Sequence, residues 1–379
     1  MQYLPPSPLS CDIFCRVVDN YGDIGVAWRL ARQLAAEYAA TIRLAVDDLA
    51  SFQRLVPSIR TGIPMQRVGE VTIVEWRDGS DATRIAPAAD LVIEAFGCGL
   101  PADYLNLMAL RAPPPFWVNL EYLSAEPWVR EHHLLPSPHV TLPLTSYFFF
   151  PGFTTRTGGL IRERDLITRR DTAARAAAKP TDQTGLHILV FGYDHAPVET
   201  LFTAISESKE TVLCRVSEGA LAERLERWRG SQAEIAPEGA PMHEFEVTPF
   251  VPLADFDDLL WRNDILFVRG EDSFVRAQWA AKPLVWHIYP QADDAHLKKL
   301  NAFLDLYCCG LSARAEAAMR RLWLAWNRPI REEIGPAWND FLAHLPALNT
   351  HALDWSKRLA DMPDLAANLL SFYRKNAKI

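Results

Sequence analysis

Short apolar runs of strand length alternate with longer amphipathic stretches of helical length along this chain, and the pattern occurs in two series. In the first series we predict a strand over 12–18, a glycine-containing loop over 19–25 and a helix over 26–38. Regular alternation of this kind predicts parallel sheets covered by helices. The other predicted strands of the first series are 41–46, 71–76, 91–95 and 116–120.

A segment rich in arginine and alanine, over 155–184, separates the two series. With 379 residues, at roughly 150 residues per domain, we expect two domains. After Leu300 the chain is predicted to be helical, with Asp361 as N-cap of a last helix over 364–375. The predicted strands of the second series are 187–191, 210–216, 244–247, 265–268 and 283–288. The predicted organisation is an α/β domain over 1–156, a connection over 157–184, a second α/β domain over 185–360, and a tail over 361–379 that packs back on the first domain.

Composition and local patterns exclude several classes of protein. Apolar residues make up 49% of the chain, yet no apolar run approaches the roughly 20 residues that cross a bilayer. The N-terminus lacks the features of a signal peptide, so we expect no membrane association and a cytoplasmic location. The net charge of −8 argues against nucleic-acid binding, which needs a dense positive face. The six cysteines show no Cys-x-x-Cys pair and no zinc spacing, so we predict buried, reduced thiols and no metal site.

Charged residues gather where the predicted strand over 265–268 gives way to a helix. In parallel α/β sheets, ligands bind at the carboxyl ends of strands, where helix N-termini present N–H groups to anions. Gly270 lets the backbone approach a ligand closely, and Ser273 is predicted to cap the helix. Arg269 supplies a fork-shaped cation for paired oxygens, so we expect an anionic ligand here.

Glu271 and Asp272 in the same segment have two readings. Carboxylates at a helix N-terminus are favoured by the helix dipole, so both side chains could serve the helix alone. In the competing reading they hold the hydroxyl groups of a sugar or ribose, while Arg269 and Ser273 stabilise a leaving diphosphate.

Several side chains near the same predicted sheet edge suit a nucleotide. Tyr289 and Gln291 follow the next strand and can donate neutral hydrogen bonds, whereas Trp286 and His287 are interpreted as core residues. A planar base stacks on aromatic rings. Candidate rings are Phe191, Tyr193 and Phe250, although core packing would also explain each of them.

The loop over 19–25 contains two carboxylates, Asp19 and Asp23. They would repel a pyrophosphate, but they suit a cation or an acceptor that must lose a proton. For Asp23, capping of the following helix is an equally good explanation, whereas Asp19, at the very end of the strand, is interpreted as functional.

Two doubly wound domains with a helical tail suggest the GT-B architecture of sugar-nucleotide glycosyltransferases, in which two Rossmann-like domains face each other across a cleft. A dehydrogenase or a periplasmic-type binding protein shares this outline. The dinucleotide fingerprint G-x-G-x-x-G and the P-loop motif are both absent, which disfavours a dehydrogenase.

With these residues in view, the chain resembles the bacterial elongation factor P arginine rhamnosyltransferases over nearly its whole length. The similarity lies in four segments, which are 14–25 (FCRVVDNYGDIG), 116–124 (FWVNLEYLS), 148–153 (FFFPGF) and 267–291. The resemblance implies an inverting, metal-independent GT-B enzyme without a cofactor. It would move L-rhamnose from dTDP-β-L-rhamnose to one arginine of elongation factor P, activating that factor for relief of polyproline stalling. We expect a monomer.

The resemblance also implies roles for individual residues. Asp19 corresponds to the catalytic aspartate of the family, with Asp23 beside it in the acceptor site, and Glu271 is a possible aid to proton transfer. One departure concerns Leu253, where related sequences have glutamine, which puts a polar contact to the base in question. The implied donor-binding residues are Phe191, Tyr193, Phe250, Arg269, Asp272, Ser273, Tyr289 and Gln291.

Overall fold

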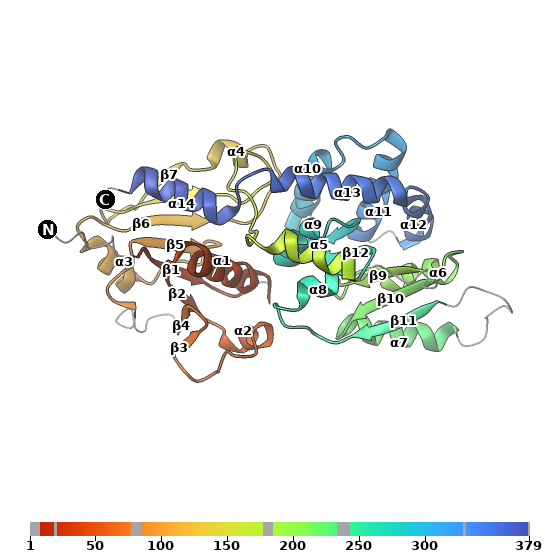
Figure 1. Ribbon diagram of the computed structural model, residues 1–379, viewed down its shortest axis with the longest axis horizontal. Coiled ribbons are helices and arrows are strands. Elements are labelled where there is room, and N and C mark those ends of the chain that lie inside the picture. The colour runs from red at the N-terminus through yellow and green to blue at the C-terminus, as the bar shows by residue number, and fades with distance from the viewer. Residues whose placement is uncertain are drawn as a thin grey trace. The chain divides into compact units, whose positions relative to one another are not determined.

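The computed structural model describes residues 8–18, 21–76, 85–176, 185–232, 243–328 and 331–377 (Figure 1). The chain divides into two compact units. The first comprises Met1–Arg164 and Met362–Ile379, and the second comprises Asp165–Asp361. Each unit is described below by itself.

The first unit contains an eight-stranded sheet within its described residues. Its order is β3-β4-β2-β1-β5-β6-β8-β7, in which β3 and β7 run antiparallel to their neighbours and all other pairs are parallel. The strands are β1 (Ser10–Cys15), β2 (Thr41–Val46), β3 (Met65–Val68), β4 (Val71–Glu75), β5 (Leu91–Ala95), β6 (Phe116–Leu120), β7 (Pro136–Pro138) and β8 (Thr145–Phe149). The helices are α1 (Gly22–Tyr38), α2 (Leu49–Leu55), α3 (Ala102–Ala109), α4 (Val129–His132) and α14 (Leu365–Asn376).

The second unit contains a five-stranded, fully parallel sheet with the order β11-β10-β9-β12-β13 in its described part. The strands are β9 (Leu186–Val190), β10 (Val212–Ser217), β11 (Glu244–Thr248), β12 (Ile265–Arg269) and β13 (Leu284–His287). The α-helices are α5 (Leu166–Ala176), α6 (Val198–Ser206), α7 (Ala220–Gln232), α8 (Phe256–Trp261), α9 (Glu271–Ala280), α10 (Ala295–Tyr307), α11 (Ala313–Asn327), α12 (Ile334–Ala343) and α13 (Leu345–Ala360), with short 3-10 turns η2 (Ala292–Asp294) and η3 (Arg331–Glu333). The prediction of an α/β fold with two parallel sheets is therefore confirmed.

The final helix α14 belongs to the first unit, as the sequence predicted. It packs against α1, and the ring of Phe372 lies 5.3 Å from that of Phe116 and 5.4 Å from that of Tyr147. The predicted N-cap is wrong, because Asp361 ends α13 and Asp364 caps α14 by accepting the Ala367 N–H at 3.0 Å. Asp364 lies directly before the first helical residue, where a side-chain acceptor reaches the free N–H groups of the first turn.

Two local predictions near the sites are also corrected. Helix α1 begins at Gly22, so the predicted loop over 19–25 ends earlier than expected; the Gly25 N–H already donates to the Tyr21 carbonyl at 3.0 Å. Helix α9 begins at Glu271 with Gly270 as its N-cap, so Ser273 lies within the first turn and does not cap the helix. The predicted connection over 157–184 contains α5, which packs against α8 and α9.

Aromatic side chains fill the second unit between its sheet and the helices α9 to α12. Trp323, Trp326 and Trp338 are fully buried, and the rings of Phe274 and Trp286 stack at 4.0 Å.

No helix in the described part of the chain is long and apolar enough to span a bilayer. Five of the cysteines are buried as predicted, but Cys309 is exposed.

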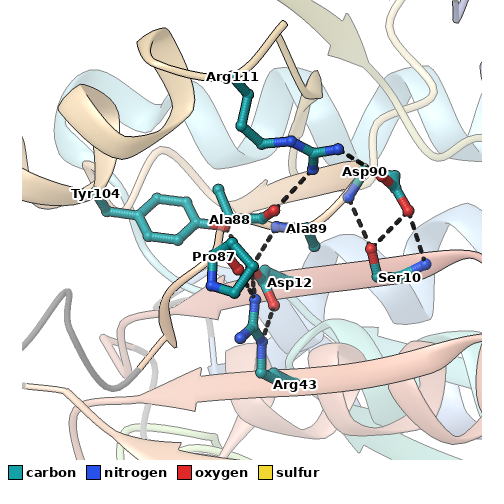
Figure 2. Close-up of polar contacts among 9 residues, drawn as sticks. All are labelled: Ser10, Asp12, Arg43, Pro87, Ala88, Ala89, Asp90, Tyr104 and Arg111. Carbon is teal, nitrogen blue, oxygen red and sulfur yellow. Dashed lines mark hydrogen bonds and ion pairs between the residues drawn. The ribbon is translucent and has the colours of Figure 1, made fainter. Parts of the chain in front are cut away.

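A buried polar network fastens the middle of the first sheet to the segment before β5 (Figure 2). Asp12 on β1 is 1% exposed and forms a two-point ion pair with Arg43 on β2, at 2.6 and 2.7 Å. The same carboxylate accepts the Tyr104 hydroxyl and the Ala89 N–H, the latter at 3.1 Å. Burial raises the pKa of Asp12, which Arg43 opposes. Asp12 thus connects two strands, a loop and α3.

We expect Asp12→Ala to lower the free energy of unfolding of the first unit by about 3–5 kcal/mol, because it leaves the Arg43 guanidinium without its buried partner. Urea unfolding followed by far-UV circular dichroism measures the loss. Asp354→Ala is the control: its carboxylate pairs with Lys357 at 3.4 Å on an exposed surface, and an effect below about 0.5 kcal/mol is expected. Equal losses in the two variants would contradict a stabilising role for the network.

Candidate active site

Each sheet has a switch point, where neighbouring strands lead into connections that run in opposite directions. In the first sheet this point lies between β1 and β5, and in the second between β9 and β12. Ligands of open α/β sheets bind outside the carboxyl ends of the strands at such points. Predicted site residues follow strands of the sheet in each unit, and the candidate residues of each unit are described separately.

In the second unit, Arg269 ends β12 with its side chain between two aromatic rings. Its guanidinium carbon lies 4.8 Å from the centre of the Phe191 ring and 4.7 Å from that of Tyr193. Both rings follow β9, the neighbouring strand. The Arg269 Nε is buried without a hydrogen-bond partner among the described residues. A buried guanidinium N–H with no acceptor is poised to receive an anionic ligand.

The helix N-terminus beside Arg269 is shaped by Gly270. Its φ of 68° and ψ of −176° belong to a backbone region that is essentially restricted to glycine. Glu271 is half-buried and Asp272 is 7% exposed, and both lie in the first turn of α9. The structure therefore brings together Arg269 and the predicted 271–273 segment at the start of one helix.

The remaining donor-site predictions concern residues that follow other strands of the same sheet. Tyr289 follows β13, is 55% exposed and meets the Tyr193 ring edge-on at 5.4 Å. Gln291 is exposed, and its N–H donates to Nδ1 of His296 at 3.2 Å. Phe250 is half-buried in the loop between β11 and α8. Nearby Leu253 is 7% exposed.

His287, interpreted from the sequence as a core residue, is indeed 2% exposed. The structure adds a contact that the sequence did not reveal: His287 Nδ1 accepts the backbone N–H of Tyr193 at 3.1 Å. Burial, with His195, Arg269 and His296 nearby, lowers the pKa of His287 to about 3. The imidazole is therefore neutral, and its proton is on Nε2 because Nδ1 acts as an acceptor.

The lowered pKa of His287 predicts acid sensitivity of the second unit. Below about pH 6.5 the unfolded chain protonates this histidine while the folded chain does not until about pH 3, so stability falls as pH decreases across that window. His287→Asn should remove up to about 1.4 kcal/mol per pH unit from this slope. Urea unfolding at pH 7, 6 and 5 measures the slope for His287→Asn and for the wild type. Parallel slopes for His287→Asn and wild type would contradict the assignment.

In the first unit, two aspartates fix the chain that leads out of β1. Asp23 is 3% exposed and accepts the Val18 N–H at 2.9 Å. Asp47, after β2, accepts the Val17 N–H at 2.9 Å. Both carboxylates therefore hold backbone immediately before residue 19. Asp19 itself, the predicted catalytic aspartate, lies outside the described residues.

Two glutamates at the same sheet edge were not singled out from the sequence. Glu94 on β5 is 7% exposed and accepts the Gly99 N–H at 2.8 Å and the Trp117 indole N–H at 3.2 Å. Burial raises the pKa of Glu94. Burial, and then the charge of Glu94, raise the pKa of Glu121, which follows β6. The signal available in the sequence was a carboxylate inside the otherwise apolar strand LVIEA.

The edges of the two sheets thus differ in charge. The edge in the first unit carries carboxylates, which suit a cationic group, and the edge in the second unit carries a guanidinium and a helix N-terminus, which suit an anion. Within the residues the structure covers, no group of three or more His, Cys, Asp or Glu side chains is placed to hold a metal ion.

Comparison with known proteins identifies the family. The family model described as Elongation-Factor P (EF-P) rhamnosyltransferase EarP matches residues 11–374. The chain belongs to the EarP family. A protein-arginine rhamnosyltransferase of Pseudomonas putida is 45% identical, covering 96% of this chain and 98% of the relative. A protein of the same name from Neisseria meningitidis is 35% identical, covering 98% of this chain and 99% of the relative.

Solved structures agree with membership of the EarP family. One that is described as the structural basis for EarP-mediated arginine glycosylation of translation elongation factor EF-P is 33% identical, with a TM-score of 0.63 and coverage of 97% of this chain and 99% of that chain. The spinosyn forosaminyltransferase SpnP is 12% identical with a TM-score of 0.51 over 97% of this chain and 99% of that chain, a likeness of fold alone. The fold of this EarP family member is that of the GT-B glycosyltransferases, as predicted.

Proposed function

We propose that this chain transfers L-rhamnose from dTDP-β-L-rhamnose to an arginine side chain of elongation factor P, with inversion and without a metal ion or cofactor. The observation that carries the proposal is the guanidinium of Arg269 at the switch point of the second sheet, with its Nε buried and unpartnered among the described residues. Membership of the EarP family and the names of the relatives support the acceptor.

The second unit would bind the donor. Arg269 and the N–H groups at the start of α9 would receive the diphosphate, and Ser273 in the first turn would add a hydroxyl donor. Phe191, Tyr193 and Phe250 would flank the nucleotide, because planar bases stack on aromatic rings. Tyr289 and Gln291 would donate hydrogen bonds from the segment after β13, and Asp272 would hold a sugar hydroxyl.

Arginine is a difficult acceptor, and its chemistry explains the carboxylates. Its guanidinium keeps its proton far above neutral pH and its charge is delocalised, so it must lose a proton as a nitrogen attacks the sugar. Asp19 would orient the guanidinium and accept that proton, aided by Glu271. Asp23 would hold the chain before Asp19 through the Val18 N–H.

Inversion at the anomeric carbon would follow from attack on the face of the sugar opposite the leaving diphosphate. The guanidinium nitrogen attacks the anomeric carbon from the face opposite the diphosphate, so the C–O bond to dTDP breaks as the new C–N bond forms. The β-linked donor then gives an α-linked product. The negative charge that develops on the leaving dTDP is met by Arg269 and the α9 N-terminus, which supports transfer without a metal ion.

The net charge of −8 fits a partner that presents an arginine, and the proposed site of action is the cytoplasm, where a monomer would meet elongation factor P.

The test of the proposed function incubates the purified protein with dTDP-β-L-rhamnose and elongation factor P and measures the intact mass of the factor. We expect the mass of one deoxyhexose to be added to the factor, and an α-anomeric signal by NMR of the product.

Two other readings make different predictions in the same assay. Another GT-B transferase would bind a sugar nucleotide but would leave elongation factor P unmodified. A non-catalytic sugar-nucleotide-binding protein would bind dTDP and show no turnover with any acceptor. Absence of added mass with folded protein would overturn the proposed function.

A further inference from the structure

The loop after β9 is tied to two different strands. Phe191 still follows the sheet, since its N–H donates to the carbonyl of Phe267 on the neighbouring β12 at 2.9 Å. Two residues later, the Tyr193 N–H reaches past β12 and donates to Nδ1 of His287 on β13 at 3.1 Å. Because the sheet order is β9-β12-β13, the loop between these two contacts crosses over the carboxyl end of β12.

Arg269 is the residue at that end of β12, and the loop encloses it. Its guanidinium carbon lies within 4.8 Å of the ring centres of both Phe191 and Tyr193. His287 is its register partner on β13, and parallel partners in register project from the same face of the sheet. His287 therefore lies beside Arg269, and it also holds the loop whose two aromatic rings contact the Arg269 guanidinium.

The contact between loop and histidine is close as well as polar. A Cβ at Gly192 would lie 3.4 Å from His287 Nδ1, an ordinary contact distance, so the loop backbone packs directly against the imidazole. The imidazole also contacts the Trp326 ring edge-on, at 5.8 Å between ring centres. Asn327 holds the end of β13 by accepting the Ile288 N–H at 3.0 Å and donating to the Trp286 carbonyl at 2.8 Å.

We propose that His287 is a positioning residue of the proposed donor site. Its hydrogen bond to Tyr193 holds the Phe191–Tyr193 loop against Arg269 and thereby orients the guanidinium toward the donor diphosphate. The role requires Nδ1 to stay unprotonated beside Arg269, His195 and His296, and burial together with these groups lowers the pKa of His287 enough to ensure this. The inference rests on the proposed function, because it needs a diphosphate ligand at Arg269.

The test measures the dissociation constant of dTDP by calorimetry for three variants. His287→Leu replaces the imidazole with an apolar side chain of similar size that has no hydrogen-bond acceptor. We expect dTDP to bind about 10-fold more weakly to this variant. His287→Asn places an oxygen at the branch position of Nδ1, and we expect affinity within about threefold of wild type. His287→Phe keeps a planar ring but also lacks the acceptor, and we expect a weakening similar to that of His287→Leu.

Two further measurements separate positioning from simple destabilisation. The KM for the sugar nucleotide should rise in His287→Leu while the KM for elongation factor P stays unchanged. The control is His351→Leu, another buried histidine of the second unit, whose Nε2 lies 2.5 Å from the Tyr307 carbonyl; it should bind dTDP as wild type does.

An unchanged dissociation constant in His287→Leu, or equal weakening in His287→Leu and His287→Asn, would overturn the inference. If His287→Leu does not fold, His287→Phe decides, and wild-type affinity in that variant overturns it. Wild-type protein that does not bind dTDP would overturn the proposed function and this inference with it, whereas wild-type binding with unaffected variants overturns the inference alone.

Discussion

Arg269→Leu is expected to weaken dTDP binding by about 30- to 1000-fold, the loss that follows when one partner of a buried charged hydrogen bond is removed. The guanidinium lies between the Phe191 and Tyr193 rings, and its buried Nε has no acceptor among the described residues. Leucine fills similar space between the rings but offers the diphosphate neither charge nor N–H groups. Calorimetry with dTDP measures the loss, and single-turnover transfer should fall in parallel.

Two variants make the Arg269 result specific. Arg269→Lys retains the charge but loses the planar fork that matches paired oxygens, so an intermediate affinity is expected. Arg314→Leu removes an exposed arginine at the start of α11 and should bind dTDP as wild type does. Wild-type affinity in Arg269→Leu would show that the diphosphate does not bind at the switch point of the second sheet.

The parallel strands of both sheets were largely predictable from the sequence. The ranges predicted for β2, β5 and β6 agree with the structure to the residue, because short and largely apolar runs bounded by turns are typical of strands in parallel sheets. The edge strands β3 and β7 were not predicted, and neither was β8, which lies beside β7. β7 is only Pro136–Pro138, and its pairing with β8 depends on tertiary contact rather than on a local pattern.

Helix starts were predicted less well, for a local reason. Glycine in the segment around Gly22 favours a loop, yet the helix begins there with the Gly25 N–H bonded to the Tyr21 carbonyl. At α9, Ser273 is a good capping residue by type, but Gly270 supplies the positive φ that turns the chain from β12 into the helix. In both cases the local sequence allows two starting points for the helix, and the tertiary structure determines which of them is used.

The chemical types in the donor site were predictable, but their contacts were not. Arg269 and the 271–273 segment were recognised because charge follows a buried strand. The enclosure of Arg269 by Phe191 and Tyr193 depends on β9 and β12 being neighbours, which is a property of strand order. The same holds for His287, whose apolar sequence surroundings favour a core residue and conceal its hydrogen bond to Tyr193.

Asp19→Asn is expected to reduce the rate of arginine transfer by about 10²- to 10⁴-fold, the usual contribution of a general base. An amide cannot accept the proton that the guanidinium must release, and neutral asparagine attracts the cationic acceptor less strongly. The proposed donor residues all lie in the second unit, so the affinity for dTDP should stay within about twofold of wild type. Single-turnover transfer to elongation factor P, read by intact mass, gives the rate, and calorimetry gives the affinity.

Asp23→Asn is the matched control for Asp19→Asn, because it makes the same chemical change four residues away. An asparagine oxygen can still accept the Val18 N–H that Asp23 now holds, so we expect Asp23→Asn to lose much less activity than Asp19→Asn. Asp23→Ala removes that acceptor and should lose more than Asp23→Asn. Equal losses in the two asparagine variants would assign Asp23 a catalytic role alongside Asp19, and full activity in Asp19→Asn would contradict the proposed mechanism.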